Sequence, residues 1–258
     1  MNKIYHYTSL NTAIEFILPK MRLRTNGLKN MNDPKENQLW AFSSKNMDYP
    51  SIYPETFSED RYIEHQFMFG NEIRENIQAI CFVNNEDNRA CFNAMMWAHY
   101  ASNHRGVCLE IDADRFIEEN KEVLINFKLE KVQYGKHEDV FIDYNRSISK
   151  EANILKIIES KYQCLFLQKS VNWEHEKEIR LLIIGKEHTY LTIENSLTGV
   201  YLGLFFPYEY RPSIDKLIST KKATIFDVSW EKNDFLRVER SMGDFRPLIL
   251  KKFLNHPK

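Results

Sequence analysis

Strand and helix patterns alternate between residues 79 and 112, and this alternation limits the possible folds more than any other part of the sequence. Residues 79–83 (AICFV) are a short apolar run that predicts a buried strand. A helical pattern follows and breaks at Gly106, after which residues 107–112 (VCLEID) predict a second strand. Because a helix between two strands must pack its apolar face against a sheet, we expect a mixed α and β fold.

The helix predicted between these strands carries one apolar stripe. Its members have the spacing of a single helix face: Phe92, Met95, Met96, His99 and Tyr100. The apolar members are expected to pack in the core rather than against a cofactor, whereas Tyr100 either packs there or stacks on a flat ligand ring. Trp97 lies off the stripe, as do His104 and Arg105 at the helix end.

The rest of the chain interleaves strands and helices without a regular repeat. Further strands are predicted at residues 3–8, 22–25, 181–184, 190–194, 199–206, 223–228 and 235–240, and helices at 10–18, 62–78, 154–166 and 208–220. The strands after residue 178 follow one another closely, as in an antiparallel meander. We therefore expect a single α+β domain over residues 1–258, with helices flanking a central mixed or antiparallel sheet, continuous or split. Residues 43–78 are a candidate insertion or lid, and residues 251–258 a frayed tail.

Charge and cysteine usage exclude several classes of protein. The 35 basic and 36 acidic residues give a formal net charge of -1. Nonspecific binding to nucleic acid is therefore not expected, because it needs clustered Lys and Arg. The 4 cysteines form no CxxC pair and no signal-like segment opens the sequence, which favours a reduced, cytoplasmic protein. No apolar run approaches the ~18 residues of a membrane span, so no membrane association is expected.

The segment from Trp173 to Arg180 places two carboxylates at the start of an apolar strand. Glu176 and Glu178 are two residues apart, and residues i and i+2 of a strand point to the same face. If strand pairing starts this early, the two carboxylates share one side with Arg180, and Trp173 lies just upstream. Acidic groups beside a cation and an aromatic ring are typical of a site for a polar ligand. The alternative is a solvated edge strand that carries an Arg–Glu ladder.

Motifs for metal, phosphate and serine chemistry are missing from the sequence. It contains no HExxH, GxGxxG, GxxxxGK[ST] or GxSxG, and His99 and His104 are five residues apart rather than four, so no metal site is expected. The first strand offers His6, followed by Tyr7 and Thr8, as donors to a nucleotide ribose; His6 is equally compatible with a core or edge position. A nearby carboxylate stabilises the positive charge that develops when a bond at a sugar C1 breaks.

Five motifs, in this order, resemble one widespread bacterial family that is catalogued as a domain of unknown function. They are His6-Tyr7-Thr8-Ser9, Asn32-Asp33-Pro34-Lys35-Glu36, Trp97-Ala98-His99-Tyr100-Ala101, His104-Arg105-Gly106-Val107-Cys108 and Trp173-x-x-Glu176-x-Glu178-x-Arg180. The resemblance covers nearly the whole chain, to about residue 219, and implies no established activity. Asn32, Asp33 and Glu36 are expected to shape a loop beside the ligand-binding cleft that would contain Glu176 and Glu178.

The order of elements is also similar, more distantly, to ADP-ribosyltransferases of the His–Tyr–Glu type. In those enzymes the His holds the ribose of NAD, a Tyr stacks on nicotinamide, and the Glu sets the ribose for attack at C1. The resemblance assigns these roles to His6, Tyr100 and Glu178, with Glu176 as the other candidate Glu. Tyr7 stands where the family usually has Gly. The resemblance implies an ADP-ribosyltransferase-like fold and NAD as a substrate.

Two functions are therefore expected as alternatives. The first is an NAD-dependent, ADP-ribosyltransferase-like enzyme that cleaves the nicotinamide–ribose bond, such as a toxin or phage-defence effector, with Glu178, Glu176 and His6 as catalytic residues. Its ligand-binding residues would be Tyr7, Thr8, Asn32, Asp33, Trp97, Tyr100, His104, Trp173 and Arg180. The second is a non-catalytic module of bacterial defence or signalling that binds a nucleotide or a protein, and it predicts that Arg180 or another cation pairs with Glu178. A nuclease is less favoured, because its Mg²⁺ would have to be held by Asp33, Glu36, Asp112 and Asp114.

Overall fold

The computed structural model describes residues 3–28, 31, 33, 36, 48–58, 62–85, 90–135, 140, 142, 144–231 and 235–240. Its helices are α1 (Leu10–Thr12), α2 (Leu18–Lys20), α4 (Tyr49–Ile52), α5 (Tyr62–Glu75), α6 (Ala94–Tyr100), α7 (Ala113–Glu119), α8 (Lys150–Phe166) and α9 (Arg211–Ile218), with a π-helical turn η1 (Ala13–Ile17) and 3-10 turns η4 (Ala90–Phe92), η5 (Val171–Glu176) and η6 (Tyr208–Tyr210). Its strands are β1 (Lys3–Thr8), β2 (Arg22–Arg24), β3 (Asn26–Gly27), β4 (Ile77–Asn84), β5 (Val107–Asp112), β6 (Phe127–Lys131), β7 (Gln133–Tyr134), β8 (Gln168–Lys169), β9 (Glu178–Ile184), β10 (Tyr190–Thr192), β11 (Leu197–Leu202), β12 (Thr224–Glu231) and β13 (Phe235–Arg240).

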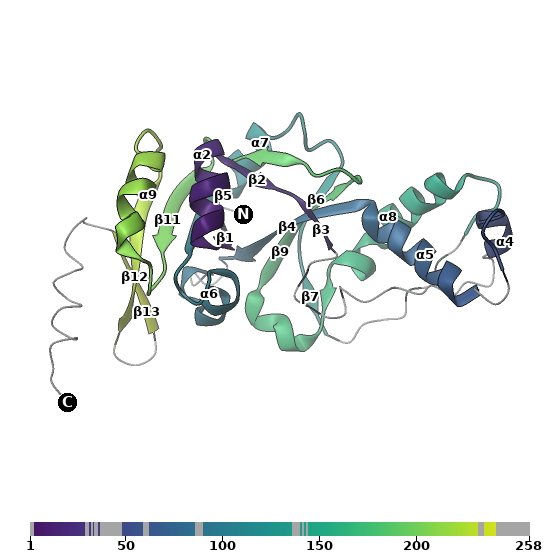
Figure 1. The fold of residues 1–258 in the computed structure, drawn as a ribbon, viewed down its shortest axis with the longest axis horizontal. Helices are drawn as coiled ribbons and strands as arrows, with labels where there is room; N and C mark the ends of the chain where they lie inside the picture. Colours follow the sequence, from purple (N-terminus) through teal and green to yellow (C-terminus); the bar gives the residue numbers. More distant parts are fainter. Residues whose placement is uncertain are drawn as a thin grey trace.

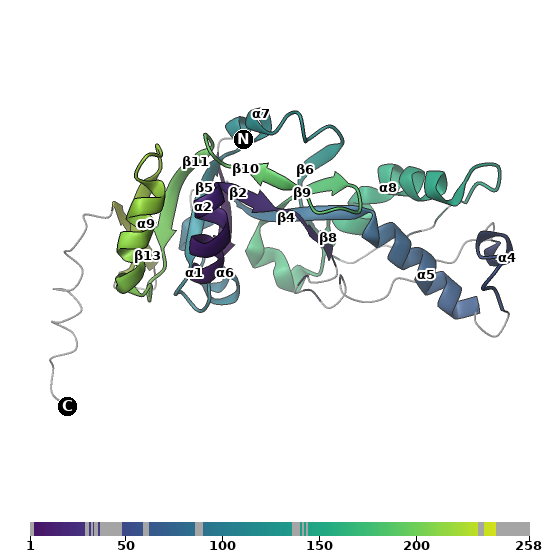
Figure 2. The same ribbon diagram turned by 45° about the horizontal axis from the view of Figure 1, so that its top comes forward.

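Nine strands of the described chain form one sheet, in the order β13-β12-β11-β5-β1-β4-β9-β6, with β3 attached to β4. Neighbouring strands are antiparallel except β11 and β12, which are parallel. Helices flank this mixed sheet, as Figures 1 and 2 show from two directions. The α+β class and the mixed central sheet predicted from the sequence are confirmed. The predicted meander is wrong, because β10 leaves the sheet to pair with β2, and β11 crosses to β5.

Alternation along the central strands gives the sheet two different faces. On one face, Ile4 and Phe82 belong to a large apolar cluster that includes side chains of α1, α2, α7 and α9. On the other face, Tyr5 and Tyr7 pack in a smaller cluster with Trp97 of α6. The first strand therefore lies in the centre of the sheet and is covered on both sides, which explains its lack of charged residues after Lys3.

Strand β4 has two partners along one of its edges. β1 pairs with its end, at Val83 and Asn84, and β3 pairs with its beginning, at Gln78 and Ala79. On this edge residues 80–82 pair with neither of these strands. This gap, called the split edge of β4 below, interrupts pairing on one edge only. The nine strands remain one sheet, which is the continuous one of the two arrangements expected from the sequence.

A second apolar core lies at one end of the sheet. Phe69 and Ile73 of α5 pack there with Ile154 and Ile158 of α8, and Figures 1 and 2 show both helices beyond the end of the sheet, with α4. The described part of the candidate lid thus contributes buried side chains to a core. Residues 43–47 and 59–61 of that candidate lid, and the tail predicted at 251–258, lie outside the described residues.

The buried face of α6 differs from the predicted stripe. Met96 and Trp97 are buried, whereas Met95 is 47% exposed. The stripe was counted from Phe92, but that residue belongs to the preceding 3-10 turn, and α6 begins only after Asn93, whose side chain caps it. The buried face of α6 is set by Trp97, which packs against Tyr7 of β1, so the predictions that Met95 packs in the core and that Trp97 lies off the apolar stripe are wrong.

Candidate functional site

The carboxylates Glu176 and Glu178 reach the site from two different backbone elements. The turn η5 is capped at its start by the Ser170 side chain and is followed by Lys177, whose φ of 46° is left-handed. Strand β9 then begins at Glu178. Strand pairing does not start early enough to include Glu176, because the left-handed residue interrupts the extended backbone first, so the condition under which Glu176 shares a strand face with Glu178 is not met. Glu178 and Arg180 do share a strand face, as predicted.

Arg180 is fully buried and connects three acceptors. Its Nε and Nη2 donate to the two carboxylate oxygens of Glu178 at 2.8 and 3.0 Å, which is a bidentate pair. Its Nη1 donates to Glu36 Oε1 at 2.6 Å and to the Phe166 carbonyl oxygen at 2.7 Å. A buried guanidinium with these partners has its charge compensated inside the protein.

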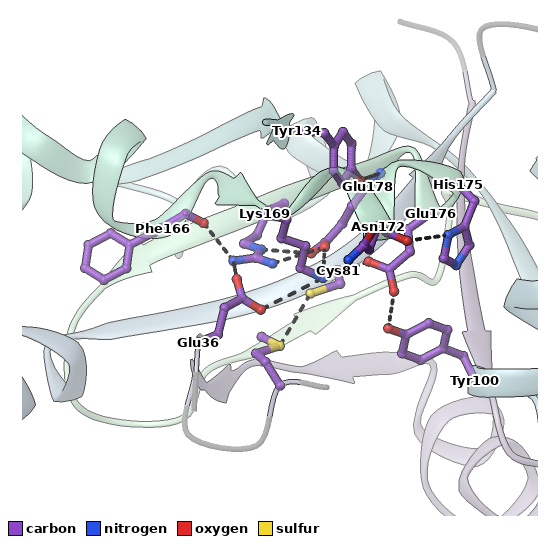
Figure 3. Close-up of polar contacts among 12 residues, drawn as sticks. Glu36, Cys81, Tyr100, Tyr134, Phe166, Lys169, Asn172, His175, Glu176 and Glu178 are labelled. Carbon is purple, nitrogen blue, oxygen red and sulfur yellow. Dashed lines mark hydrogen bonds and ion pairs between the residues drawn. The ribbon is translucent and has the colours of Figure 1, made fainter. Parts of the chain in front are cut away.

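Lys169 joins the two carboxylates, and Figure 3 shows it at the centre of the cluster. Its Nζ lies 2.7 Å from an oxygen of Glu176, 2.7 Å from an oxygen of Glu178 and 3.9 Å from Glu36 Oε2. The parallel pair β7 and β8 aligns Lys169 with Tyr134, whose hydroxyl accepts the backbone N–H of Glu178 at 2.8 Å. Two short strands outside the main sheet therefore position both side chains against the start of β9.

Helix α6 forms the other side of the site and is tied to η5 at both of its ends. At its start, Asn93 Nδ2 donates to the backbone carbonyl of His175 at 2.5 Å. At its last residue, the Tyr100 hydroxyl donates to Glu176 Oε1. Glu176 is therefore held by α6 on one oxygen and by Lys169 on the other.

Burial and neighbouring charges act in opposite directions on the pKa values of this cluster. Burial acts to raise the pKa of Glu178, but the charges of Arg180 and Lys169 outweigh it and lower that pKa to about 2. For Glu36, burial outweighs the same two cations and raises the pKa above its usual range. Burial acts to lower the pKa of Lys169, but the carboxylates outweigh it and raise that pKa. At neutral pH Glu178 is therefore ionised and Lys169 is an ammonium.

A pocket of about 120 Å³ lies between α6, η5 and the split edge of β4. Its described lining consists of Tyr5, His6, Tyr7, Met31, Cys81, Phe82, Val83, Met96, Tyr100, Lys169, Glu176 and Glu178. In and beneath the pocket, three carboxylates and two cations give this described cluster a formal charge of -1. That excess of negative charge favours a ligand group that is positively charged.

The pocket brings together five of the residues predicted from the sequence, namely His6, Tyr7, Tyr100, Glu176 and Glu178. Three others lie around it. Arg180 is buried beneath the carboxylates. Trp173 lies beside the cluster, with its ring centroid 5.6 Å from Lys169 Nζ. Trp97 supports Tyr7 from the core, with ring centroids 5.0 Å apart.

Four further predicted residues are not in the described lining. Thr8 is buried at the end of β1, and His104 is in the turn that follows α6. Asp33 is buried, and its backbone carbonyl accepts the N–H of Glu36 at 3.0 Å, so this short stretch does help to place Glu36 beside the cluster. Asn32 lies outside the described residues.

His6 approaches the pocket from the opposite face of the sheet. Strand pairing from β1 through β4 to β9 places Tyr7 and Glu178 on one face. His6 alternates to the other face, where its ring lies edge-on to Phe82 with centroids 5.9 Å apart. Its Nδ1 is 3.0 Å from the Cys81 carbonyl oxygen, and burial lowers the pKa of the imidazole, so the neutral ring donates this hydrogen bond across the split edge.

Several residues of the site were missed in the sequence. Lys169 carries no motif, although its position two residues after the apolar run of residues 165–167 and shortly before two close carboxylates is a usable signal. Tyr134 and Cys81 gave no local signal, because their roles depend on strand pairing. The Cys81 thiol contacts Glu178 by a hydrogen bond, and its sulfur lies 4.0 Å from Met31 Sδ.

The chemistry of the described site is that of charged side chains. No group of three or more His, Cys, Asp and Glu side chains in the described chain has the arrangement of a metal site.

No helix of the described part has both the length and the apolar character to cross a bilayer.

A family model described as "Protein of unknown function (DUF2971)" matches residues 96–181. The matched segment runs from α6 into β9 and therefore contains Tyr100, Lys169, Glu176, Glu178 and Arg180. The sequence expectation of a domain of unknown function is supported to this extent. No curated protein and no solved structure matches the chain.

Proposed function

We propose that the chain is an ADP-ribosyltransferase-like enzyme that binds NAD in this pocket and cleaves the bond between nicotinamide and ribose. The observation that carries the proposal is that Tyr100 and two carboxylates meet at one pocket, whose described lining also includes His6, with its ring on the opposite face of the sheet. They come from β1, from α6 and from the η5–β9 segment, which is the order implied by the resemblance to enzymes of the His–Tyr–Glu type. Strands β1 and β9 flank β4 on its two edges, which supports this assignment of strands.

The charge of the pocket suits this reaction. The nicotinamide ring of NAD is cationic, and the described cluster has one more carboxylate than it has cations. When the C–N bond breaks, its electron pair stays with nicotinamide, which becomes neutral, and positive charge moves to the ribose as an oxocarbenium ion. A fixed carboxylate close to that ribose lowers the barrier. Water or a side chain of an acceptor then bonds to C1 and loses a proton.

The two carboxylates are assigned different roles. Both oxygens of Glu178 are bonded to Arg180, and its pKa of about 2 keeps it ionised, so its role is to stabilise positive charge from beneath the pocket. Glu176 exchanges one partner more easily, because the Tyr100 side chain that holds it is partly exposed. We therefore assign the direct contact with the ligand to Glu176.

A second function is favoured by a different observation. Arg180 donates hydrogen bonds to both carboxylate oxygens of Glu178, and Lys169 Nζ lies 2.7 Å from one of these oxygens. A carboxylate paired in this way is typical of a structural role. This pairing supports a non-catalytic module in which the same pocket binds a nucleotide, or a group of a protein partner, without cleaving it.

Release of nicotinamide from NAD, measured by liquid chromatography, distinguishes the two functions. The wild-type protein is expected to release it, and Glu178→Gln is expected to slow release by roughly 10²–10³, the usual effect of removing one group that stabilises charge in a transition state. Glu174→Gln is the matched control, because Glu174 is exposed on the same turn and should leave the rate unchanged. Saturable NAD binding without nicotinamide release supports the second function and refutes the first.

A further inference from the structure

The pocket is smaller than the ligand that the proposed function gives it. Its volume is about 120 Å³. Sites for cofactors and comparable small molecules have volumes of roughly 300–1,000 Å³. The described structure is therefore a closed state, and the pocket has to open before a nucleotide enters. The contacts that keep it closed run between α6 and η5.

The hydrogen bond from Tyr100 to Glu176 connects two of the elements that line the pocket, α6 and η5. Both residues line it, and they come from segments that are 76 residues apart in the chain. Figure 3 shows Tyr100 pointing at Glu176 from the end of the cluster that lies away from Glu36. The other oxygen of Glu176 is bonded to Lys169 at 2.7 Å, so Glu176 stays in place when Tyr100 leaves.

The moving part is a side chain rather than the helix. Trp97 of the same helix is fully buried, and Asn93 ties the start of α6 to η5. Tyr100 is the last residue of α6 and is partly exposed, so a rotation of its side chain would leave these two anchors in place.

We infer that the hydrogen bond between Tyr100 and Glu176 is a latch that keeps the pocket closed until a ligand group replaces the Tyr100 hydroxyl. The free protein is then autoinhibited at this site. The inference rests on the proposed function, which gives the pocket a ligand larger than the pocket itself; the labelling test below measures opening in the absence of that ligand.

The rate at which the Cys81 thiol is alkylated reports opening of the pocket in the absence of any ligand. Its thiol lines the pocket, and burial raises its pKa well above the usual range, so the closed state reacts slowly with alkylating reagents. Cys108 is fully buried in β5 and is not among the lining residues, so it reports global unfolding. The ratio of the two labelling rates separates local opening from unfolding.

The test is the rate at which iodoacetamide labels Cys81 in the native, folded chain, followed by mass spectrometry of its peptide. Tyr100→Phe keeps the ring and removes the latch hydroxyl, and it is expected to raise the Cys81 rate by about 10-fold or more, the effect of losing a hydrogen bond to a charged group. Tyr201→Phe is the matched control, because its hydroxyl donates to the Glu110 carboxylate at 2.7 Å outside the pocket. It should leave the Cys81 rate unchanged.

A rise at Cys81 alone supports the latch. An unchanged Cys81 rate in Tyr100→Phe overturns it, and so does an equal rise at Cys81 and Cys108, because that result reports unfolding. Addition of NAD to the same samples keeps the two proposals apart. If Tyr100→Phe raises Cys81 labelling but NAD neither binds nor protects Cys81, the latch stands and the NAD-cleaving function fails.

Discussion

Replacement of Arg180 by methionine tests the buried charge cluster directly. The change keeps a long apolar side chain but removes four hydrogen bonds, two to Glu178, one to Glu36 and one to the Phe166 carbonyl. Removing one partner of a buried ion pair typically costs about 3–5 kcal/mol, because the remaining charge is left uncompensated. We expect a loss of this size in the free energy of unfolding of Arg180→Met, measured by urea denaturation at pH 7.

A surface pair provides the control for this measurement. Arg115 lies 3.6 Å from Asp112 and its side chain is 61% exposed, so Arg115→Met should change stability by no more than about 1 kcal/mol. The loss in Arg180→Met should also shrink below about pH 4.5, because protonation removes the uncompensated charge of the carboxylates. A loss for Arg180→Met as small as that of the control, or one that does not depend on pH, would refute the reasoning.

Two further predictions concern acid stability and close packing. The pKa of Glu178 is lowered from 4.5 to about 2 in the folded chain. Its contribution of about 3 kcal/mol is therefore complete above pH 4.5 and is lost as pH falls toward 2, so thermal unfolding should show a smaller acid-induced loss in Glu178→Gln than in the wild type. A Cβ atom on Gly106 would lie 2.3 Å from the Thr8 carbonyl oxygen, whereas one on Gly135 would have no neighbour within 4 Å. Gly106→Ala should destabilise the fold by about 1–3 kcal/mol in urea denaturation, and Gly135→Ala should not; equal effects would contradict the packing of the turn after α6 on β1.

The elements with strong local patterns could be predicted from the sequence. Strand β4 contains the apolar run of residues 79–83, β5 begins directly after the break at Gly106, and α8 keeps helical spacing, so the local pattern locates all three. The order of strands in the sheet has no such local signal. β1 lies between β4 and β5 because of pairings over about a hundred residues, and these depend on the complete core.

The site could be predicted in part for the same reason. Glu178 and Arg180 are two residues apart in one strand, so their shared face follows from strand geometry. The left-handed conformation of Lys177 could not be predicted, because lysine has no preference for it, and it places Glu176 on a different element. The position of Lys169 at the site depends on the pairing of β7 with β8. Each of these strands has two residues, and such short strands give no periodic pattern in the sequence.

Calorimetric titration of the folded protein with NAD tests the central claim most directly. The account predicts saturable binding by the wild type, retained in Glu174→Gln and lost or strongly weakened in Glu176→Gln, because Glu176 is the pocket carboxylate assigned to the ligand. An absence of binding heat in a wild-type protein shown to be folded, or equal affinities in all three proteins, would contradict the assignment of this pocket to NAD.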